Sequence, residues 1–313
     1  MQERTRHIAV VGAGAIGCYF GGLLARAGVP VTLIGRKLHV DAIKQNGLWL
    51  QTLDREERIA IAATEDMAAV QDAGLVLFCV KSPDTDAAAA AMAPHLASDA
   101  IILSLQNGVD NVERIRSQVK NMAIPALVYA AAYMAGPGCV KHTGGGSLVI
   151  GLMPEHRADA GCGRLLADIA ARFARAGVPV TISDSIEVDL WTKLVMNCAY
   201  NAISALGSAR YSQMVAMPEV RDLMREAAGE AMRVARAKGI PLPDSLLDAT
   251  IRLADSMPQT ISSTAQDILK GRRTEIDHLN GYVAQEAQAL GVPTPVNRTL
   301  ATLVKLLEQA KRT

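Results

Sequence analysis

The chain has 313 residues, of which 50% are hydrophobic and 20% are charged, and its formal net charge is +1 at pH 7. That length suits two domains better than one, and an almost neutral chain has no general attraction to nucleic acid or to a membrane surface. Five scattered cysteines without a Cys-x-x-Cys pair argue against a disulfide framework and favour a reducing compartment, so we expect a cytoplasmic protein.

The first part of the sequence alternates short apolar runs with helical patterns. Runs rich in Val, Ile and Leu predict strands buried on both faces, as in a parallel sheet whose strands are joined by helices. These predicted strands are 7–12, 30–35, 73–80, 100–105, 123–130 and 178–184. The alternating segment 48–63 predicts a hairpin, and 138–151 predicts antiparallel structure around a glycine-rich turn. We expect no signal peptide ahead of the first strand and no membrane-spanning segment, because no apolar stretch approaches the length that crossing a bilayer requires.

Near residue 185 the pattern changes to helical periodicity. Two Gly-x-Pro-x-Pro breaks, at 239–243 and 291–295, stop and restart helices. The predicted helices are 186–208, 218–239, 243–256, 261–270, 274–290 and 294–311. We therefore expect an α/β domain at 1–184 followed by an all-helical domain at 185–313.

A glycine-rich hexad lies between the first predicted strand and a helical segment. Glycines in this context permit a tight turn and close approach of the backbone to a pyrophosphate, while the helix N-terminus offers N–H groups to the anion. We therefore expect a dinucleotide to bind here; a tight turn that binds nothing is the alternative. The residues of the hexad are Gly12, Ala13, Gly14, Ala15, Ile16 and Gly17.

The second predicted strand ends in Gly35-Arg36-Lys37. An enzyme that uses NAD usually has an acidic residue at this point, which hydrogen-bonds the ribose diol. Arginine instead can clamp a 2′-phosphate with its planar fork, so Arg36 favours NADPH over NADH. The alternative is a pair of exposed basic residues on a loop.

Two further polar residues follow later strands. Lys81 ends the run that begins at 73, and Asn107 follows the run at 100–105. Ligands of open parallel sheets lie at the carboxyl ends of the strands, so both residues are candidates for ligand binding. Asn107-Gly108 could equally form a plain turn.

Three polar residues recur at every fourth position of the segment DLWTKLVMNCAYN, residues 189–201. On a helix Lys193, Asn197 and Asn201 form one row that drifts slowly around the axis. Because polar groups inside an otherwise apolar helix are costly unless something pairs with them, the row predicts a ligand site. Ser263 near a helix start and Glu275 on a later helix are weaker candidates, since on these residues alone a helix cap and a solvated or ion-paired surface carboxylate are the favoured explanations.

Other kinds of catalytic site find no support. The six histidines include no two within four residues, and no acidic cluster has the spacing of metal ligands, so we expect no metal. A Gly-x-Ser-x-Gly elbow, which would indicate a serine hydrolase, is missing from the sequence.

Taken together these motifs resemble those of the ketopantoate reductase (2-dehydropantoate 2-reductase) family. The resemblance runs from the hexad through Gln106–Val109 and the WTKLVMNCAYN row to ISSTAQDI and TEIDHLNG at 274–281. It implies a Rossmann dinucleotide-binding domain, a helical domain like that of 6-phosphogluconate dehydrogenase, and reduction of 2-dehydropantoate to pantoate by NADPH in the pathway to pantothenate and coenzyme A. A small 2-keto acid is then the expected partner, and a homodimer is left open.

Residue by residue, the family's general acid falls on Lys193 and its substrate-holding asparagines on Asn197 and Asn201. The serine that binds the substrate carboxylate in this family falls on Ser263. Four further residues match cofactor contacts of the family: three of them bind the nucleotide, and the fourth, a glutamate, helps to hold the cofactor. They are Arg36, Lys81, Asn107 and Glu275. Asn107 is also expected to contact the substrate.

One position departs from the family pattern. An Asn-Gly pair commonly follows the last asparagine of the row, whereas this chain has Ala209-Arg210-Tyr211-Ser212. The resemblance therefore does not assign a residue that contacts the substrate hydroxyl, and it does not determine which 2-keto acid is the substrate. Two alternatives remain: a reductase of another 2-keto acid or a β-hydroxyacid dehydrogenase, and a non-catalytic NADPH-sensing protein.

Overall fold

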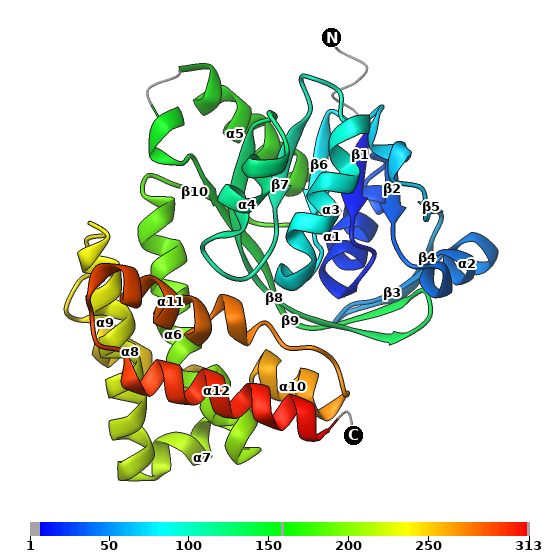
Figure 1. Cartoon of the computed structure of the whole chain (residues 1–313). Coiled ribbons are helices and arrows are strands. Elements are labelled where there is room, and N and C mark those ends of the chain that lie inside the picture. The colour runs from blue at the N-terminus through cyan, green and yellow to red at the C-terminus, as the bar shows by residue number, and fades with distance from the viewer. Residues whose placement is uncertain (1–6, 158–159, 312–313) are drawn as a thin grey trace. The chain divides into compact units, whose positions relative to one another are not determined.

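A computed structural model describes residues 7–157 and 160–311, and these belong to two compact units that divide between Ile186 and Glu187. The first unit is an α/β structure and the second is helical (Figure 1). Among the described residues, no helix combines the length and the apolar character that crossing a bilayer requires. All five cysteines are free thiols.

A mixed sheet forms the first unit, and six of its strands run parallel. In spatial order these are β5, β2, β1, β6, β7 and β8. Their bounds are β1 Ile8–Val11, β2 Val31–Ile34, β5 Ala62–Thr64, β6 Leu75–Phe78, β7 Ile101–Ser104 and β8 Ala123–Gly136. The sheet continues through the remaining strands, β9 Cys139–Gly151, β3 Leu48–Gln51, β4 Glu56–Ile59 and β10 Val180–Ser183.

Both faces of the parallel strands are buried, because alternate residues enter two separate hydrophobic cores. Ile8 and Val10 of β1 pack in the core that includes residues of α1 (Ala15–Arg26) and α5 (Ala160–Arg175). Ala9 and Val11 pack in the other core, with residues of α3 (Thr85–Met92) and α4 (Asn111–Gln118). The continuous apolar runs of the sequence are explained by this double burial.

Two details of the predicted strands were wrong. The glycines at 144–146 form no turn: they lie inside β9, where the pairing with β8 has register shifts, and the turn instead falls at 137–138. Gly145 and Gly146 have φ of +68° and +129°, a conformation that glycine adopts at bulges. The predicted hairpin 48–63 is confirmed for β3 and β4, but its last residues form β5, which pairs with β2.

Seven helices make up the described part of the second unit. They are α6 Ile186–Gly207, α7 Tyr211–Ala216, α8 Pro218–Ala237, α9 Leu246–Ser256, α10 Ser263–Leu269, α11 Asn280–Leu290 and α12 Pro295–Ala310. Proline at the first position of α8 and of α12 fits a helix start, and Gly291 in the left-handed region ends α11. The helix predicted from 274 begins six residues later, since the intervening residues form a 3₁₀ turn, Ile276–His278.

A network of hydrogen bonds around one buried carboxylate connects four helices of this unit. Glu230 on α8, 2% exposed, accepts hydrogen bonds from the N–H groups of Val296 (2.9 Å) and Asn297 (2.8 Å) at the start of α12. The Asn297 amide also donates to Glu230 (2.8 Å), and its oxygen accepts from Asn280 at the start of α11 (2.9 Å). Asn280 donates in turn to the carbonyl of Cys198 on α6, next to Asn197 (3.0 Å).

Candidate functional site

The glycine-rich hexad forms the turn between β1 and α1. A Cβ on Gly12, whose φ is +107°, would lie 2.7 Å from the backbone of Cys79, and one on Gly17 would lie 2.2 Å from the Gly12 carbonyl. A Cβ on Gly14 would meet nothing within 4 Å. Gly12 and Gly17 are therefore required for packing, whereas Gly14 leaves open space for a ligand.

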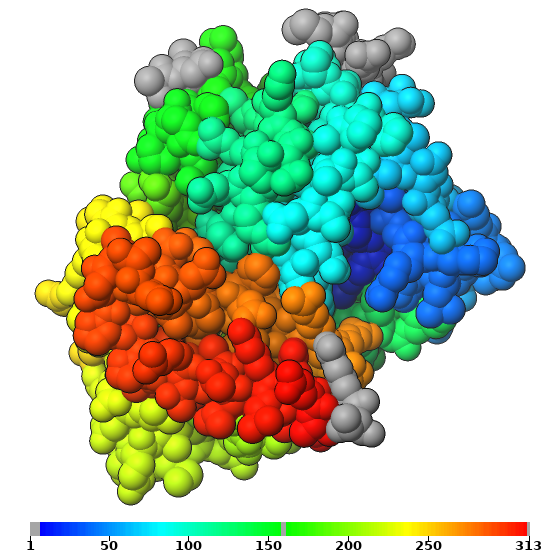
Figure 2. All heavy atoms as spheres, in the orientation of Figure 1, coloured from blue at the N-terminus to red at the C-terminus, as the bar shows by residue number. Residues whose placement is uncertain are grey.

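The start of α1 suits an anion. Gly14 is the N-cap and supplies no side-chain hydrogen bond, so the first N–H groups of α1 have no side-chain cap. In Figure 2 the first described part of the chain, in dark blue, is set back between the cyan and lighter blue surfaces of the same unit. This open, uncapped turn fits the pyrophosphate of a dinucleotide.

Arg36 lies directly after β2, beside this turn. Gly35 is so close to Ala13 that a Cβ on it would lie 2.4 Å from the Ala13 Cβ, and the N–H of Ala13 bonds the Ile34 carbonyl (2.9 Å). Arg36 is the N-cap of α2 (Lys37–Asn46) and its side chain is exposed. Lys37 forms an exposed ion pair with Asp41 (3.0 Å), which leaves Arg36 as the better candidate for a phosphate.

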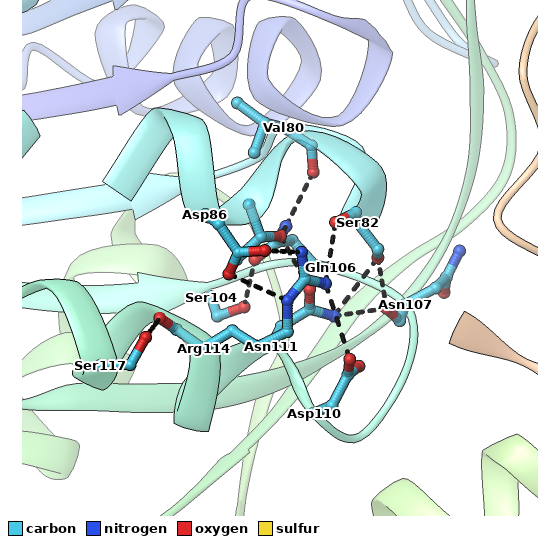
Figure 3. A network of polar contacts seen from close by, with 11 residues as sticks. Val80, Ser82, Asp86, Ser104, Gln106, Asn107, Asp110, Asn111, Arg114 and Ser117 are labelled. Carbon is cyan, nitrogen blue, oxygen red and sulfur yellow. Dashed lines mark hydrogen bonds and ion pairs between the residues drawn. The ribbon is translucent and has the colours of Figure 1, made fainter. Parts of the chain in front are cut away.

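Lys81 and Asn107 lie on adjacent loops at the carboxyl ends of β6 and β7. Lys81 is the N-cap of the short turn Ser82–Asp84, and Asn107 is half-buried. A buried network of side chains joins the two loops (Figure 3). The structure therefore places Gly12, Lys81 and Asn107 after the carboxyl ends of three neighbouring strands, since β1, β6 and β7 are adjacent in the sheet.

Lys193, Asn197 and Asn201 all lie on α6, as the fourfold spacing predicted. Lys193 and Asn197 are half-buried and Asn201 is 3% exposed. The side chains between them, including Leu194, Val195 and Cys198, belong to the apolar interior. The polar row is therefore set in an apolar helix.

Burial makes Lys193 an unusual lysine. Burial lowers the pKa of the ammonium, because a charge is less stable away from water, and the Glu275 carboxylate partly offsets this effect. Together they bring the pKa from 10.5 to about 8. A lysine with this pKa is still largely protonated at neutral pH and can release its proton readily. That balance suits a general acid.

The start of α10 lies against the end of the polar row. The Ser262 hydroxyl donates to the Asn201 carbonyl (3.0 Å), and the Ser262 N–H donates to the Ser204 hydroxyl (3.1 Å). Ser262 rather than Ser263 caps α10, accepting from the Ala265 N–H (3.0 Å). Ser263 is exposed at the first helical position, so its hydroxyl is not used as the cap.

Glu275 does not lie on a helix, which corrects the sequence-based prediction. It precedes the 3₁₀ turn at 276–278, and its neighbour Thr274 is 3% exposed. The Thr274 N–H donates to the Glu308 carboxylate on α12, while the Thr274 hydroxyl accepts from Ile276 (3.3 Å). These contacts fix the backbone on both sides of Glu275.

Several residues that support the site were not predicted. Their side chains are polar and buried, and each bonds a residue distant in sequence. They are Ser82, Thr85, Gln106, Asn111, Glu230, Asn280 and Asn297. The sequence held signals for three of them: Gln106 and Asn280 lie inside the motifs Gln106–Val109 and TEIDHLNG, and Asn111 follows Asn107 by four residues at a helix start.

Comparison with known proteins covers nearly the whole chain. Residues 8–155 match the family described as ketopantoate reductase PanE/ApbA, and residues 185–308 match its C-terminal domain. The 2-dehydropantoate 2-reductase of Halobacterium salinarum is 32% identical, over 96% of this chain and 99% of that protein. The corresponding enzyme of Pyrococcus horikoshii is 32% identical, over 96% and 97%.

Solved structures agree with this match. A PanE/ApbA family ketopantoate reductase from Ralstonia eutropha JMP134 is 48% identical, with a TM-score of 0.91 over 98% of this chain and all of that one. A 2-dehydropantoate 2-reductase from Geobacter metallireducens is 28% identical, with a TM-score of 0.87 over 97% and 99%.

Proposed function

Because the chain belongs to the ketopantoate reductase family, we propose that it reduces 2-dehydropantoate to pantoate with NADPH, a step toward pantothenate and coenzyme A. The observation that carries the proposal is the row of Lys193, Asn197 and Asn201 on α6. Polar side chains in an apolar helix cost free energy unless they are paired, and the polar groups of a ligand would supply the partners of this row.

The residues of the first unit would hold the dinucleotide. The N–H groups at the start of α1 bind the pyrophosphate, and Gly14 leaves room for it. Arg36 binds the 2′-phosphate through its guanidinium, which favours NADPH. Lys81 and Asn107 make further nucleotide contacts, and Glu275 helps to hold the cofactor. When bound, NADPH supplies the hydride.

The residues of the second unit would bind and protonate the substrate. The Ser263 hydroxyl donates to the substrate carboxylate, while the amides of Asn197 and Asn201 hold the keto acid and orient the lysine. As negative charge develops on the ketone oxygen, the Lys193 ammonium stabilises it and donates the proton. Its pKa of about 8 keeps the proton available at neutral pH.

A different 2-keto acid is the second candidate substrate, because of one observation. Tyr211 replaces the asparagine expected after the row, and its ring lies 4.3 Å from that of Tyr200, centroid to centroid. A phenol there fills more volume than an amide and changes the polar contacts available to a substrate hydroxyl. The reaction type is the same in both cases.

Replacement of Lys193 tests the proposed chemistry. Lys193→Ala should lower kcat by about 10²-fold or more, the usual scale for losing a general acid, while the Kd of NADPH changes only a few-fold. Added alkylamines should restore part of the rate, because they supply the missing ammonium. A shape-matched Lys193→Met variant should lose the rate similarly but resist this rescue. Near-normal kcat in Lys193→Ala would remove Lys193 from the mechanism.

A further inference from the structure

Asn107 is held by a network of buried side chains from the loops that follow β6 and β7 (Figure 3). We propose that Asn111, together with Thr85 and Gln106, is a positioning residue that fixes the Asn107 loop for cofactor and substrate binding. This inference deepens the proposed function and rests on it. None of the three side chains needs to touch the ligands, since each acts through the backbone of the loop.

Asn111 makes the contacts nearest to Asn107. Its amide nitrogen donates to the Asn107 carbonyl (2.6 Å) and to the Ser82 hydroxyl (3.3 Å), and its amide oxygen accepts from the Thr85 hydroxyl (2.9 Å). The Ser82 hydroxyl donates to the same Asn107 carbonyl (2.8 Å). Two donors from different elements therefore fix the peptide that follows Asn107, just before Gly108 with its φ of +99°.

Gln106 completes the connection to the other loop. Its amide nitrogen donates to the Val80 carbonyl (3.0 Å), just before Lys81, and to the Thr85 hydroxyl (2.7 Å). Its amide oxygen accepts from Ser104 (2.9 Å). The hydrogen bonds thus run in one direction, from Gln106 to Thr85, from Thr85 to Asn111 and from Asn111 to Asn107.

The three side chains of the network are buried, and an arginine on its solvent side makes further hydrogen bonds to the same loops. Thr85 is fully buried, Asn111 is 3% exposed and Gln106 is 7% exposed. On the outer side, Arg114 donates to the Ser82 carbonyl (2.9 Å) and forms a fork with Asp86 (3.1 and 2.8 Å). Buried polar groups are costly unless all are satisfied, and a satisfied network is rigid.

The location of the network indicates why this rigidity is useful. It lies at the carboxyl ends of two parallel strands, where open α/β sheets bind their ligands. A small displacement of a group that contacts substrate or cofactor can lower a rate strongly. Apolar side chains could join the two loops, but they would not set the direction of the Asn107 peptide.

A double-mutant cycle tests the inference. We would measure kcat, KM and the Kd of NADPH for Asn111→Ala, Asn107→Ala and the double variant, with 2-dehydropantoate as substrate. Because Asn111 acts through Asn107, Asn111→Ala alone should lower kcat/KM by about tenfold or more, but only about twofold further when Asn107 is already alanine. Additive losses would overturn the proposal.

A matched control variant separates positioning from stability. Val112→Ala removes buried methyl groups from the next residue of α4, outside the network, so it should lower Tm by as much as Asn111→Ala yet leave kcat/KM unchanged. If Val112→Ala lowers kcat/KM equally, Asn111 has only a structural role.

Thr85 provides a second test if Asn111→Ala does not fold. Thr85→Val keeps the shape but removes the hydroxyl and should lower kcat/KM about tenfold, whereas Thr85→Ser keeps the hydroxyl and should stay within about twofold. Equal values for the two variants would contradict the inference. If the unmutated protein binds NADPH but does not reduce 2-dehydropantoate, the proposed function fails, and the same cycle measured on the Kd of NADPH still decides the role of Asn111. If it binds no NADPH, both the proposed function and the positioning role of Asn111 are contradicted.

Discussion

The Glu275 carboxylate acts on the Lys193 ammonium: burial lowers the pKa of this lysine and Glu275 partly offsets the shift, which leaves the pKa at about 8. The two residues belong to the same unit but are far apart in sequence. Burial makes the proton of Lys193 easier to release, and Glu275 keeps the lysine protonated at neutral pH. The pair therefore sets the pH range in which Lys193 can act as an acid.

Glu275→Gln should shift the pH profile of the enzyme. A general acid must be protonated, so kcat/KM should fall as pH rises through about 8. Loss of the carboxylate removes a stabilising charge, which lowers the pKa of Lys193 and moves the fall to lower pH. The measurement is kcat/KM for the keto acid from pH 6 to 10 in both proteins, with saturating NADPH because Glu275 is also expected to hold the cofactor. If the fall of kcat/KM occurs at the same pH or at a higher pH in Glu275→Gln, Glu275 does not raise the pKa of Lys193.

Arg36→Asp should reverse the cofactor preference. We expect the unmutated protein to bind NADPH at least about tenfold more tightly than NADH, since a hydrogen bond to a charged group contributes about 1.5–3 kcal/mol. Aspartate would repel the 2′-phosphate and accept from a ribose diol. Lys37→Ala is the matched control and should change the ratio little, because Lys37 is exposed and paired with Asp41. Equal Kd values for the two cofactors in the unmutated protein would refute the role of Arg36.

Tyr211→Asn should lower stability and KM together. Tyr211 is 7% exposed and packs on Tyr200, whose hydroxyl donates to the Ile251 carbonyl (2.9 Å) and accepts from the Ala254 N–H (3.2 Å). Removing the ring leaves space in this cluster and should cost about 2–4 kcal/mol in the free energy of unfolding. If residue 211 reaches the substrate, the restored amide should also lower the KM for 2-dehydropantoate. Tyr211→Phe, which keeps the ring, separates the two effects, and a higher KM in Tyr211→Asn would show that an amide at 211 does not improve binding.

Glu230→Ala should destabilise the second unit. The variant leaves the N–H groups of Val296 and Asn297 without their carboxylate, and we expect a loss of about 3–5 kcal/mol, since each unsatisfied buried donor costs about 1–3 kcal/mol. Urea unfolding followed by Trp191 fluorescence, in a Trp49→Phe background, reports on this unit alone. Glu226→Ala, an exposed residue one turn earlier on α8, is the control. A midpoint equal to that of the control would show that the buried carboxylate is not needed.

The sequence predicted the features that residues close together in the chain form by themselves. The glycine hexad and the fourfold spacing of Lys193, Asn197 and Asn201 are properties of one turn and one helix, so the turn between β1 and α1 and the row on α6 could be expected. The family resemblance was confirmed over both units. The role of each site residue remains a prediction.

Interactions between distant segments could not be predicted in this way. Gly144–Gly146 look like a turn, but pairing with β8 holds them inside a long strand as bulges. Asn111 looks like an ordinary helix start until the fold brings Thr85 to its side chain. The apolar pattern of α11 extends back to 274 and predicts a helix that includes Glu275, whereas the contact of Thr274 with α12 is followed by a 3₁₀ turn at 276–278.

The most direct test of the central claim is the steady-state oxidation of NADPH by the purified chain with 2-dehydropantoate, beside a panel of branched and unbranched 2-keto acids. We predict that 2-dehydropantoate is reduced to pantoate, with one NADPH consumed per product, and that Lys193→Ala abolishes most of this rate. Rapid reduction of another 2-keto acid with no reaction of 2-dehydropantoate would keep the chemistry but refute the substrate. No NADPH oxidation with any member of the panel would contradict the account as a whole.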